Sequence, residues 1–313
     1  MTETRFDLRH TVVISHADGG FNRKHGTEEI ERVAQEAQVP HHEVHTLQQL
    51  DEAISQCPES TSLLVINAGD GTVCRVVQQL RTRPLFTSEP YLALLQGGTT
   101  NMIHRDVGWH GEPKSALQQL FSGIHEHNVS VQQRQPLRIS EVGQPERYGF
   151  FFATNAIVRG ILQAREQLHR RGLTGRTSEI LSALRMLGNL LLRKLENDPV
   201  MAPTMVNLSV NEQASEEREQ IFLIAFTLRN LILGIRPLRN GQISGLSALN
   251  WPNYSISQWL RKLVRAKLDG FYSLSLNGNF SWILDGEIYH HTLENTALNI
   301  RLDDPVNFIV RER

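Results

Sequence analysis

The segment Ser62-Leu-Leu-Val-Ile66, followed by Asn67-Ala-Gly-Asp-Gly-Thr72, decides the fold class of this chain. Its first part is short and almost wholly apolar, which is typical of a strand buried on both faces of a sheet. Residues 73–80, which come next, have the pattern of a helix. A buried strand that runs through a glycine turn into a helix indicates an α/β domain with a parallel sheet.

The glycine turn itself has two interpretations. Gly69 and Gly71 allow the backbone to come close to a ligand, and amides at the start of the following helix favour an anion such as phosphate. Asp70 would repel a phosphate unless a cation lies between them, so the segment points to a nucleotide bound with magnesium. The alternative is a simple turn with a helix cap, because Asp-Gly is common in turns.

Two further glycine segments favour the nucleotide interpretation. Gly19-Gly20 follows the apolar strand of residues 11–14, and Gln96-Gly-Gly-Thr-Thr-Asn101 follows the apolar strand of residues 91–95. In a parallel sheet all three loops leave at the carboxyl edge, where ligands bind. The chain has no G-x-x-x-x-G-K-[ST] motif, and Cys74 stands where a dinucleotide fingerprint needs its third glycine.

The predicted secondary structure changes after residue 131, from alternating strands and helices to mainly strands. Helical patterns at 27–38, 47–54 and 114–121 alternate with the strands before that point, which predicts an α/β nucleotide-binding domain over residues 1–133. Strand patterns that alternate apolar and polar residues follow it, with helical patterns at 161–195 and 257–268. We therefore expect a β-sandwich-like C-terminal domain with helical insertions over residues 134–313. Its expected strands are at 137–140, 148–152, 205–210, 220–228, 270–276, 282–284, 296–302 and 306–310.

Composition excludes several classes of protein. The 313 residues are 40% hydrophobic and 21% charged, with a net charge of -1, so a globally basic nucleic-acid binder is not expected. Two cysteines are too few for a disulfide scaffold. The first ten residues lack the apolar core of a signal peptide, and the most apolar stretch, 221–235, is too short to span a membrane. These features predict a cytoplasmic protein that reaches at most the surface of a membrane.

Three motifs in order carry a family resemblance. Gly69-Asp-Gly-Thr72, Gly98-Thr99-x-Asn101 and Leu284-Asp-Gly-Glu287 together resemble the diacylglycerol kinase catalytic family, which includes sphingosine, ceramide and bacterial lipid kinases. The first motif alone is shared with NAD kinases. The resemblance implies an ATP-binding α/β domain, then a β-sandwich domain, with the active site between them. It also implies phosphoryl transfer from ATP, with magnesium, to a lipid hydroxyl.

The resemblance assigns roles to individual residues. Gly69, Asp70, Gly71 and Thr72 would hold the ATP phosphates, with Asp70 as the contact to magnesium. Glu287 would be the general base that accepts the hydroxyl proton, supported by Asp285, although Asp-Gly at this point also predicts a hairpin turn. The remaining residues expected to line the nucleotide pocket are Gly19, Gly20, Thr46, Gly98, Thr99 and Asn101.

Departures from the family pattern keep other functions open. Ala68 replaces a glycine, Arg75 replaces a glutamate, and the Arg239-Asn-Gly-Gln242 segment offers no carboxylate for a second metal. A kinase for a soluble acceptor such as NAD is one alternative. A degenerate nucleotide-binding module that regulates a partner is another. The oligomeric state is left open, a homodimer being one option.

Basic residues gather in two regions, and in the second they lie near aromatic residues in the sequence. The first region has eight arginines and lysines from Arg159 to Lys194, against three glutamates in residues 159–196. The second is the cluster from Arg261 to Lys267, which lies near Trp251 and Trp259 in the sequence. Such segments suit an anionic bilayer, where a lipid kinase meets its substrate, although a solvated helix face is equally consistent. Near the second glycine loop, Arg105 is the side chain best suited to pair with a phosphate.

Overall fold

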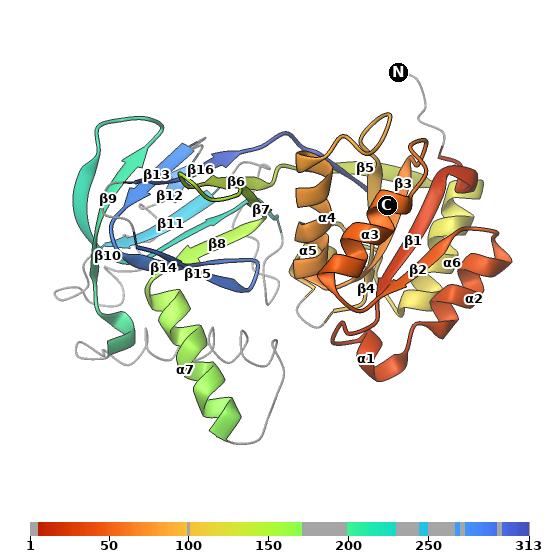
Figure 1. Cartoon of the computed structure of the whole chain (residues 1–313), viewed down its shortest axis with the longest axis horizontal. Coiled ribbons are helices and arrows are strands. Elements are labelled where there is room, and N and C mark those ends of the chain that lie inside the picture. The colour runs from red at the N-terminus through yellow and green to blue at the C-terminus, as the bar shows by residue number, and fades with distance from the viewer. Residues whose placement is uncertain are drawn as a thin grey trace. The chain divides into compact units, whose positions relative to one another are not determined.

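The computed structural model describes residues 6–98, 101–170, 199–229, 244–249, 267–269, 273–292 and 296–312. These residues form two compact units. The first unit holds the described residues up to Gln135 together with those from Asp304 onward (Figure 1). The second unit holds the described residues between Pro136 and Asp303.

The first unit is built on a six-stranded sheet with the strand order β2-β1-β3-β4-β17-β5. All its pairings are parallel except that of β17 with β5, so the predicted parallel α/β domain is confirmed. The three buried strands expected from the sequence are β1, β3 and β4. The strands are β1 (Thr11–His16), β2 (His41–Val44), β3 (Leu63–Ala68), β4 (Tyr91–Gln96), β5 (Val129–Arg134) and β17 (Val306–Arg311).

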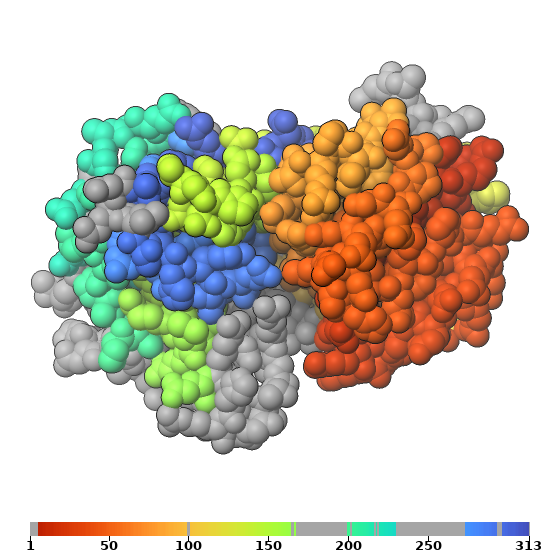
Figure 2. All heavy atoms as spheres, viewed as in Figure 1, coloured from red at the N-terminus to blue at the C-terminus, as the bar shows by residue number. Residues whose placement is uncertain are grey.

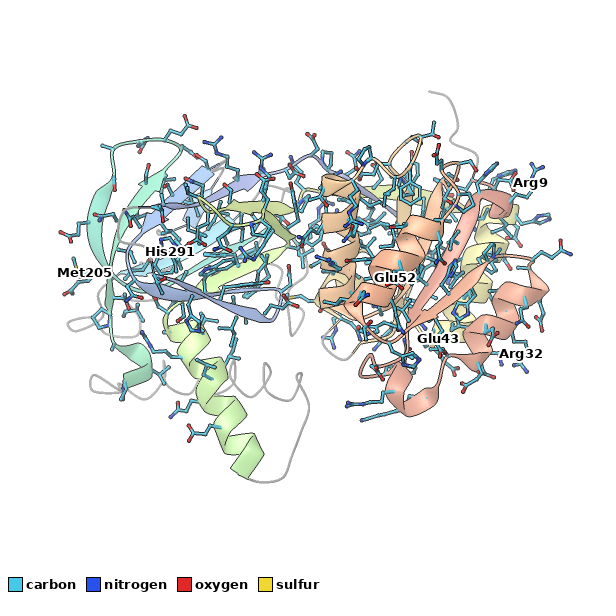
Figure 3. The ribbon with its side chains drawn as sticks, in the orientation of Figure 1. Arg9, Arg32, Glu43, Glu52, Met205 and His291 are labelled. Carbon is cyan, nitrogen blue, oxygen red and sulfur yellow. The ribbon has the colours of Figure 1, made fainter. Side chains whose placement is uncertain are left out.

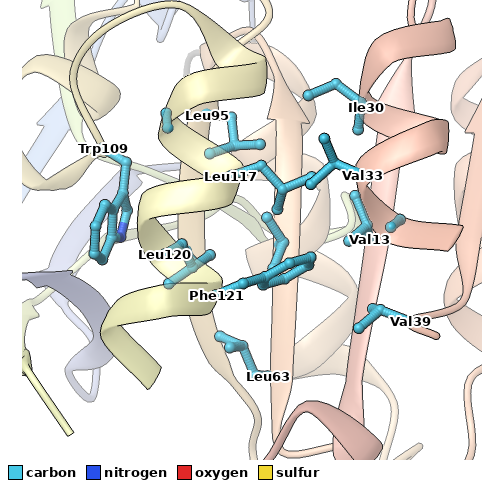
Figure 4. Packing of buried hydrophobic residues seen from close by; sticks show 14 of the residues in the cluster. Val13, Ile30, Val33, Val39, Leu63, Leu95, Trp109, Leu117, Leu120 and Phe121 are labelled. Carbon is cyan, nitrogen blue, oxygen red and sulfur yellow. The ribbon is translucent and has the colours of Figure 1, made fainter. Parts of the chain in front are cut away.

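Helices cover both faces of this sheet. Apolar side chains of α2 and α6 pack on one face, against strand residues such as Val13, Val65 and Ala93 (Figure 4). The neighbouring residues Val12, Ile14 and Leu64 are also buried, and alternation along a strand turns them to the other face. The helices are α1 (Asn22–His25), α2 (Glu28–Glu36), α3 (Leu47–Gln56), α4 (Asp70–Thr82), α5 (Met102–Val107) and α6 (Pro113–His125), and a 3-10 turn, η1 (Leu8–His10), precedes β1.

Helices α3 and α4 are joined by an ion pair. The Nε of Arg75 donates to Asp51 Oδ1 at 2.9 Å, and its Nη2 donates to the other carboxylate oxygen. In the space-filling view, orange atoms of the segment that includes these two helices make up much of the visible surface of the first unit (Figure 2). Arg75, one of the departures from the family pattern, thus ties two helices of this unit together.

The last strand corrects the predicted domain boundaries. Residues 306–310 were expected in the second domain, but β17 lies in the sheet of the first unit, between β4 and β5. The indole Nε1 of Trp109 donates to the carbonyl of Ile309 at 2.9 Å, which fixes the strand from the loop after α5. The carbonyl of Trp109 in turn accepts a hydrogen bond from His104 Nε2 at 2.6 Å.

The described residues of the second unit form an eleven-stranded antiparallel sheet. Nine strands follow the order β15-β14-β8-β10-β9-β13-β16-β6-β7, and the other two branch from it, since β11 pairs with β10 and with β12. Its strands are β6 (Leu137–Ser140), β7 (Arg147–Gly149), β8 (Phe151–Thr154), β9 (Thr204–Val210), β10 (Glu216–Phe226), β11 (Ser244–Leu249), β12 (Lys267–Asp269), β13 (Ser273–Asn277), β14 (Phe280–Leu284), β15 (Glu287–His291) and β16 (Leu298–Leu302). A 3-10 turn, η2 (Pro199–Met201), precedes β9.

One face of this sheet encloses a single apolar cluster. Leu137 of β6 and Trp282 of β14 come from near opposite ends of the path and still share that cluster, so the sheet curves round on itself. The predicted β-rich domain is confirmed, with one curved antiparallel sheet as its framework. The other face packs on helix α7 (Ala156–Arg170) through Ile157 and Ile161. The first ten residues of the helix predicted at 161–195 lie in α7, and the rest lie outside the described residues.

A buried histidine of the second unit has both of its ring nitrogens paired within that unit. His291 is fully buried, and its Nδ1 lies 2.8 Å from Glu141 Oε1 while its Nε2 lies 2.9 Å from the carbonyl of Thr296. Figure 3 shows His291 inside the unit and Met205, which is half exposed, at its outer side. The predicted helix at 257–268 falls outside the described residues except for Lys267 and Leu268, which belong to β12.

Among the helices that the structure describes, none combines the length and the apolar character needed to cross a lipid bilayer. Helix α7, for example, runs for 15 residues and includes charged side chains.

We expect acid to destabilise the first unit through His104. Burial lowers the pKa of its imidazole to about 4, whereas the unfolded chain binds a proton at an ordinary histidine pKa near 6.5. The unfolded state therefore gains protons first, and stability falls as the pH drops from about 6.5 to about 4. The loss should reach about 3 kcal/mol. Urea unfolding of the full chain, followed by tryptophan fluorescence over this range, measures it.

The matched variant is His104→Gln, whose amide can still donate to Trp109. Its stability should change less between pH 6.5 and pH 4 than that of the original chain. Equal pH dependence in the two proteins would show that His104 is not the titrating group.

Candidate functional site

The first turn of α4 follows directly from β3. Ala68 ends the strand, Gly69 caps the helix, and Asp70 is the first helical residue. The first backbone N–H groups of a helix lack the usual partner four residues earlier, which makes this end attractive to anions. The N–H of Thr72 here donates to the carbonyl of Gly69 at 3.1 Å, so the amides at issue are those of Asp70 and Gly71. No described atom outside the helix lies within 4 Å of the place that a Cβ on Gly71 would occupy. The turn therefore has room for a ligand beside Gly71.

The structure brings all three predicted glycine loops together. A Cβ on Gly19 would stand 2.5 Å from the carbonyl oxygen of Gly97, and one on Gly97 would stand 2.6 Å from the amide nitrogen of Ala68. A Cβ on Gly98 would overlap the Cα of Gly69. Backbone packs on backbone at these positions, so their glycines are required by the fold whatever ligand binds.

Asp70 links α4 to α5. Its two carboxylate oxygens accept the backbone N–H groups of Met102 at 2.8 Å and Ile103 at 2.9 Å, so it caps the start of α5. Burial raises the pKa of Asp70, opposed by these two hydrogen bonds and by the positive charge of Arg105. Among the described residues, no group of three His, Cys, Asp or Glu side chains could hold a metal ion. The magnesium role expected of Asp70 stays a prediction.

Asn101 closes the loop that Gly98 opens. Its Oδ1 accepts the N–H of Gly98 at 3.1 Å and its Nδ2 donates to the carbonyl of Gly98 at 2.8 Å. It has a left-handed backbone, with φ of 47°, and is buried. The side chain is thus committed to the loop itself. Thr99, another predicted pocket residue, lies outside the described residues.

Thr46 is the N-cap of α3. Its hydroxyl accepts the N–H of Gln49 at 3.2 Å, and Gln49 Oε1 accepts the N–H of Thr46 at 3.3 Å, which completes a capping box. The residue is exposed, and its nucleotide contact stays a prediction. Gly20 is half-buried in the turn after β1, close in sequence to Gly19.

A histidine that the sequence did not single out lies beside the first turn of α4. His16, the last residue of β1, has its Nδ1 at 2.9 Å from the hydroxyl of Thr72 and its Nε2 at 3.1 Å from the carbonyl of His45. Its own carbonyl accepts the N–H of Gly19 at 3.0 Å. A single histidine after a strand matches no motif, and this position could not have been found without the fold.

His104 and Arg105, which follow the second glycine loop, differ in exposure. His104 is buried and bonded to Trp109, and cannot face a ligand. Arg105 is exposed on α5 and near enough to Asp70 to affect its titration. The guanidinium of Arg105 therefore remains the candidate cation for a bound phosphate.

The Asp-Gly-Glu motif forms the turn between β14 and β15, as the hairpin interpretation predicted. Asp285 has a left-handed backbone, with φ of 46°. Its carboxylate accepts the N–H of Phe150 at 2.7 Å and of Phe151 at 3.0 Å, and its own N–H donates to the carbonyl of Phe151 at 2.9 Å. Asp285 therefore anchors the turn to the start of β8 (Phe151–Thr154).

Glu287 begins β15 and is half-buried. One of its carboxylate oxygens accepts the hydroxyl of Tyr289 at 2.6 Å. Burial and this carboxylate raise the pKa of the Tyr289 phenol. The Tyr289 ring stacks on Trp282, with centroids 4.4 Å apart, and carries the guanidinium of Arg147 4.6 Å from its centroid. Glu287 is thus held by a fixed aromatic neighbour.

Residues 10–132 match the family model described as the diacylglycerol kinase catalytic domain. The matched residues are nearly all of the described N-terminal part of the first unit. The match supports a phosphotransferase. No curated protein matches the chain in sequence.

Solved structures share the fold of the whole chain. Two structures from Bacillus anthracis str. Sterne, provisionally assigned as diacylglycerol kinases, are 16% and 15% identical, with TM-scores of 0.64 and 0.63. The first match covers 97% of this chain and 95% of the other, and the second covers 96% of each. A third, described as a diacylglycerol kinase from the same organism, is 14% identical with a TM-score of 0.57, and the match covers 97% of this chain and 96% of that one. At this identity the likeness establishes the fold.

The basic segments predicted to meet a membrane fall mostly outside the described residues. Arg159, the first of them, is engaged within the second unit, since its Nε donates to the carbonyl of Val200 at 2.9 Å and its Nη2 donates to the carbonyl of Ala202. The membrane contact stays a prediction.

Two glycines of the first unit should respond differently to the same substitution. Gly98→Ala forces a methyl group into the backbone of Gly69, and we expect it to lower the free energy of unfolding by about 1–3 kcal/mol. Gly71→Ala places the same group in open space, so stability should change by less than about 1 kcal/mol. Chemical denaturation of both variants measures the difference, and equal losses would contradict the packing described for the loops.

Proposed function

We propose that the chain is an ATP-dependent kinase that transfers the γ-phosphoryl group to a hydroxyl of a diacylglycerol-like lipid. The observation that carries this proposal is the first turn of α4, where the space beside Gly71 adjoins the amides of the first two helical residues, Asp70 and Gly71. The match to the diacylglycerol kinase catalytic domain over residues 10–132 supports it. A polyphosphate is the ligand that such an anion site on a kinase domain would hold.

Charge around the turn favours an anion despite the acidic residue in the motif. The carboxylate of Asp70 points to the amides of α5, so it is compensated there. Arg105 adds an exposed positive charge on the same helix. The α4 amides and Arg105 would bind the phosphates of ATP, and the backbone at Gly71 would lie closest to them.

Magnesium does not fit a site of the protein's own among the described residues. Both carboxylate oxygens of Asp70 already accept backbone N–H groups, and the described part of the chain holds no group of three His, Cys, Asp or Glu side chains suited to a metal ion. We therefore propose that magnesium arrives with the nucleotide, as MgATP, in place of the direct contact to Asp70 that the sequence predicted.

Glu287 is the residue we propose as general base. Its carboxylate would accept the proton of the lipid hydroxyl as that oxygen forms a bond to the γ-phosphorus, while the bond from phosphorus to the bridging oxygen breaks and ADP leaves with the electron pair. Asp285 would act as a positioning residue, because both of its carboxylate oxygens are bonded to the backbone of residues 150 and 151. The proposal requires the β14–β15 turn to reach the bound nucleotide.

The direct test measures transfer of the γ-phosphate of ATP to a panel of lipids in mixed micelles, with NAD assayed beside them. We expect a lipid to be labelled, and Glu287→Gln to lower kcat by about a hundredfold or more, because general-base catalysis typically contributes that much. The control is Glu212→Gln, which alters an exposed carboxylate paired with Arg301 and should leave kcat unchanged.

Each outcome of that assay separates the alternatives. If NAD is labelled and no lipid is, the acceptor is a soluble molecule and the proposed lipid acceptor is wrong. ATP binding without transfer to any acceptor would favour a regulatory nucleotide-binding module. Full activity in Glu287→Gln would remove the proposed base.

A further inference from the structure

We infer that His16 is a positioning residue for the phosphate-binding turn, and that it takes up a proton when an anion binds there. This inference rests on the proposed function, since the anion it concerns is the polyphosphate of ATP. His16 joins three segments of the first unit: the end of β1, the first turn of α4 through Thr72, and the corner before α3 through His45. It therefore fixes the helix end whose amides would meet the phosphates.

The hydrogen bonds determine how the ring is protonated. A carbonyl oxygen can only accept, so His16 Nε2, 3.1 Å from the carbonyl of His45, must carry a hydrogen. In the neutral ring Nδ1 then has a lone pair, and the hydroxyl of Thr72 must donate to it across 2.9 Å. The ring is held at both nitrogens in the tautomer with hydrogen on Nε2.

The partner at Nδ1 allows this ring to become charged without losing a hydrogen bond. A hydroxyl donates and accepts equally well, so Thr72 can turn its hydrogen away and accept from a protonated Nδ1. The carbonyl of His45 accepts from Nε2 in both states. A positive charge can therefore appear next to the first turn of α4 while the three segments stay joined.

An anion bound at that turn would favour the charged ring. Thr72 is one residue from Gly71, where the phosphate is proposed to lie, and its side chain is buried with little exposure to any ligand. The Thr72 hydroxyl would therefore influence anion binding through its hydrogen bond to His16, without contacting the anion itself. Binding that favours the protonated ring must be tighter at lower pH, by up to about tenfold for each pH unit over the range in which histidine titrates.

Titratable groups also lie on the segments that His16 joins. Asp18, in the loop after β1, and Glu43, on β2, contact the ring of His45 at 3.6 Å and 3.3 Å. On α4 the nearest acid in sequence to Thr72 is Asp70, which is bonded to the amides of α5. Their titration is common to the original chain and to variants at His16, so a comparison between these proteins isolates His16.

The experiment is calorimetric titration of the full chain with ATP at pH 8 and pH 6, in buffers of different ionisation enthalpy. The number of protons taken up per ATP follows from the buffer dependence, and the ionisation of ATP itself cancels between variants. We expect His16→Gln to take up fewer protons than the original chain and to lose most of the gain in affinity at pH 6. His16→Ala should bind ATP about tenfold more weakly at pH 8, and His16→Gln, which can still bond at both ends, should recover part of that loss.

Two further variants make the result specific. Thr72→Val removes the hydroxyl that accepts from the charged ring, so it should also abolish the extra proton uptake, whereas Thr72→Ser should keep it. His125→Gln, an exposed histidine on α6, should behave as the original chain. Equal proton uptake in the original chain and in His16→Gln, or uptake that persists in Thr72→Val, would overturn the inference.

Failure of the proposed function would look different. If the original chain does not bind ATP, both the nucleotide site and this inference fall. If it binds ATP with the expected proton uptake but phosphorylates neither lipid nor NAD, the role of His16 holds and the catalytic proposal fails.

Discussion

Backbone packs directly on backbone where the loops after β1, β3 and β4 meet, and the rest of the first unit depends on this contact. Gly19 approaches the carbonyl of Gly97, and Gly98 approaches the Cα of Gly69, at distances that leave no room for a side chain. The packing brings the starts of α4 and α5 close enough for Asp70 to span them. Any larger residue at these glycines would move a helix end rather than a surface loop.

Polar residues of the motifs divide into those that hold the loops and those that remain available to a ligand. The side chains of Asp70, Asn101 and Asp285 are all hydrogen-bonded to backbone groups. The carboxylates of Asp70 and Asp285 each accept two N–H groups. What is left around the α4 turn is a set of amides, the space beside Gly71 and the exposed Arg105. Phosphate binding by such a site depends on preorganised backbone dipoles, and the acidic residues act mainly by fixing where those dipoles point.

Strands and turns that local patterns specify could be predicted from the sequence, whereas features that depend on contacts between distant residues could not. The apolar runs that became β1, β3 and β4 were recognisable because strands buried on both faces are continuously apolar. Strand β2 was missed because its residues His41, His42 and Glu43 are polar, as an edge strand of the sheet allows. The run at 306–310 was recognised as a strand, but no local signal indicates that it returns to the first sheet. In the same way, the hairpin at Asp285 was predictable, while the roles of His16 and of the Asp70 carboxylate depend on partners 29 to 56 residues away.

The most direct test of the central claim, that the start of α4 is the anion site, is an amide spectrum of the 15N-labelled full chain titrated with ATP. The account predicts that the amide resonances of Gly71 and Asp70 shift most among the loop glycines and their neighbours, while that of Gly98, which is bonded to Asn101, moves little. Saturable binding of ATP that leaves the Gly71 and Asp70 amides unchanged would contradict it.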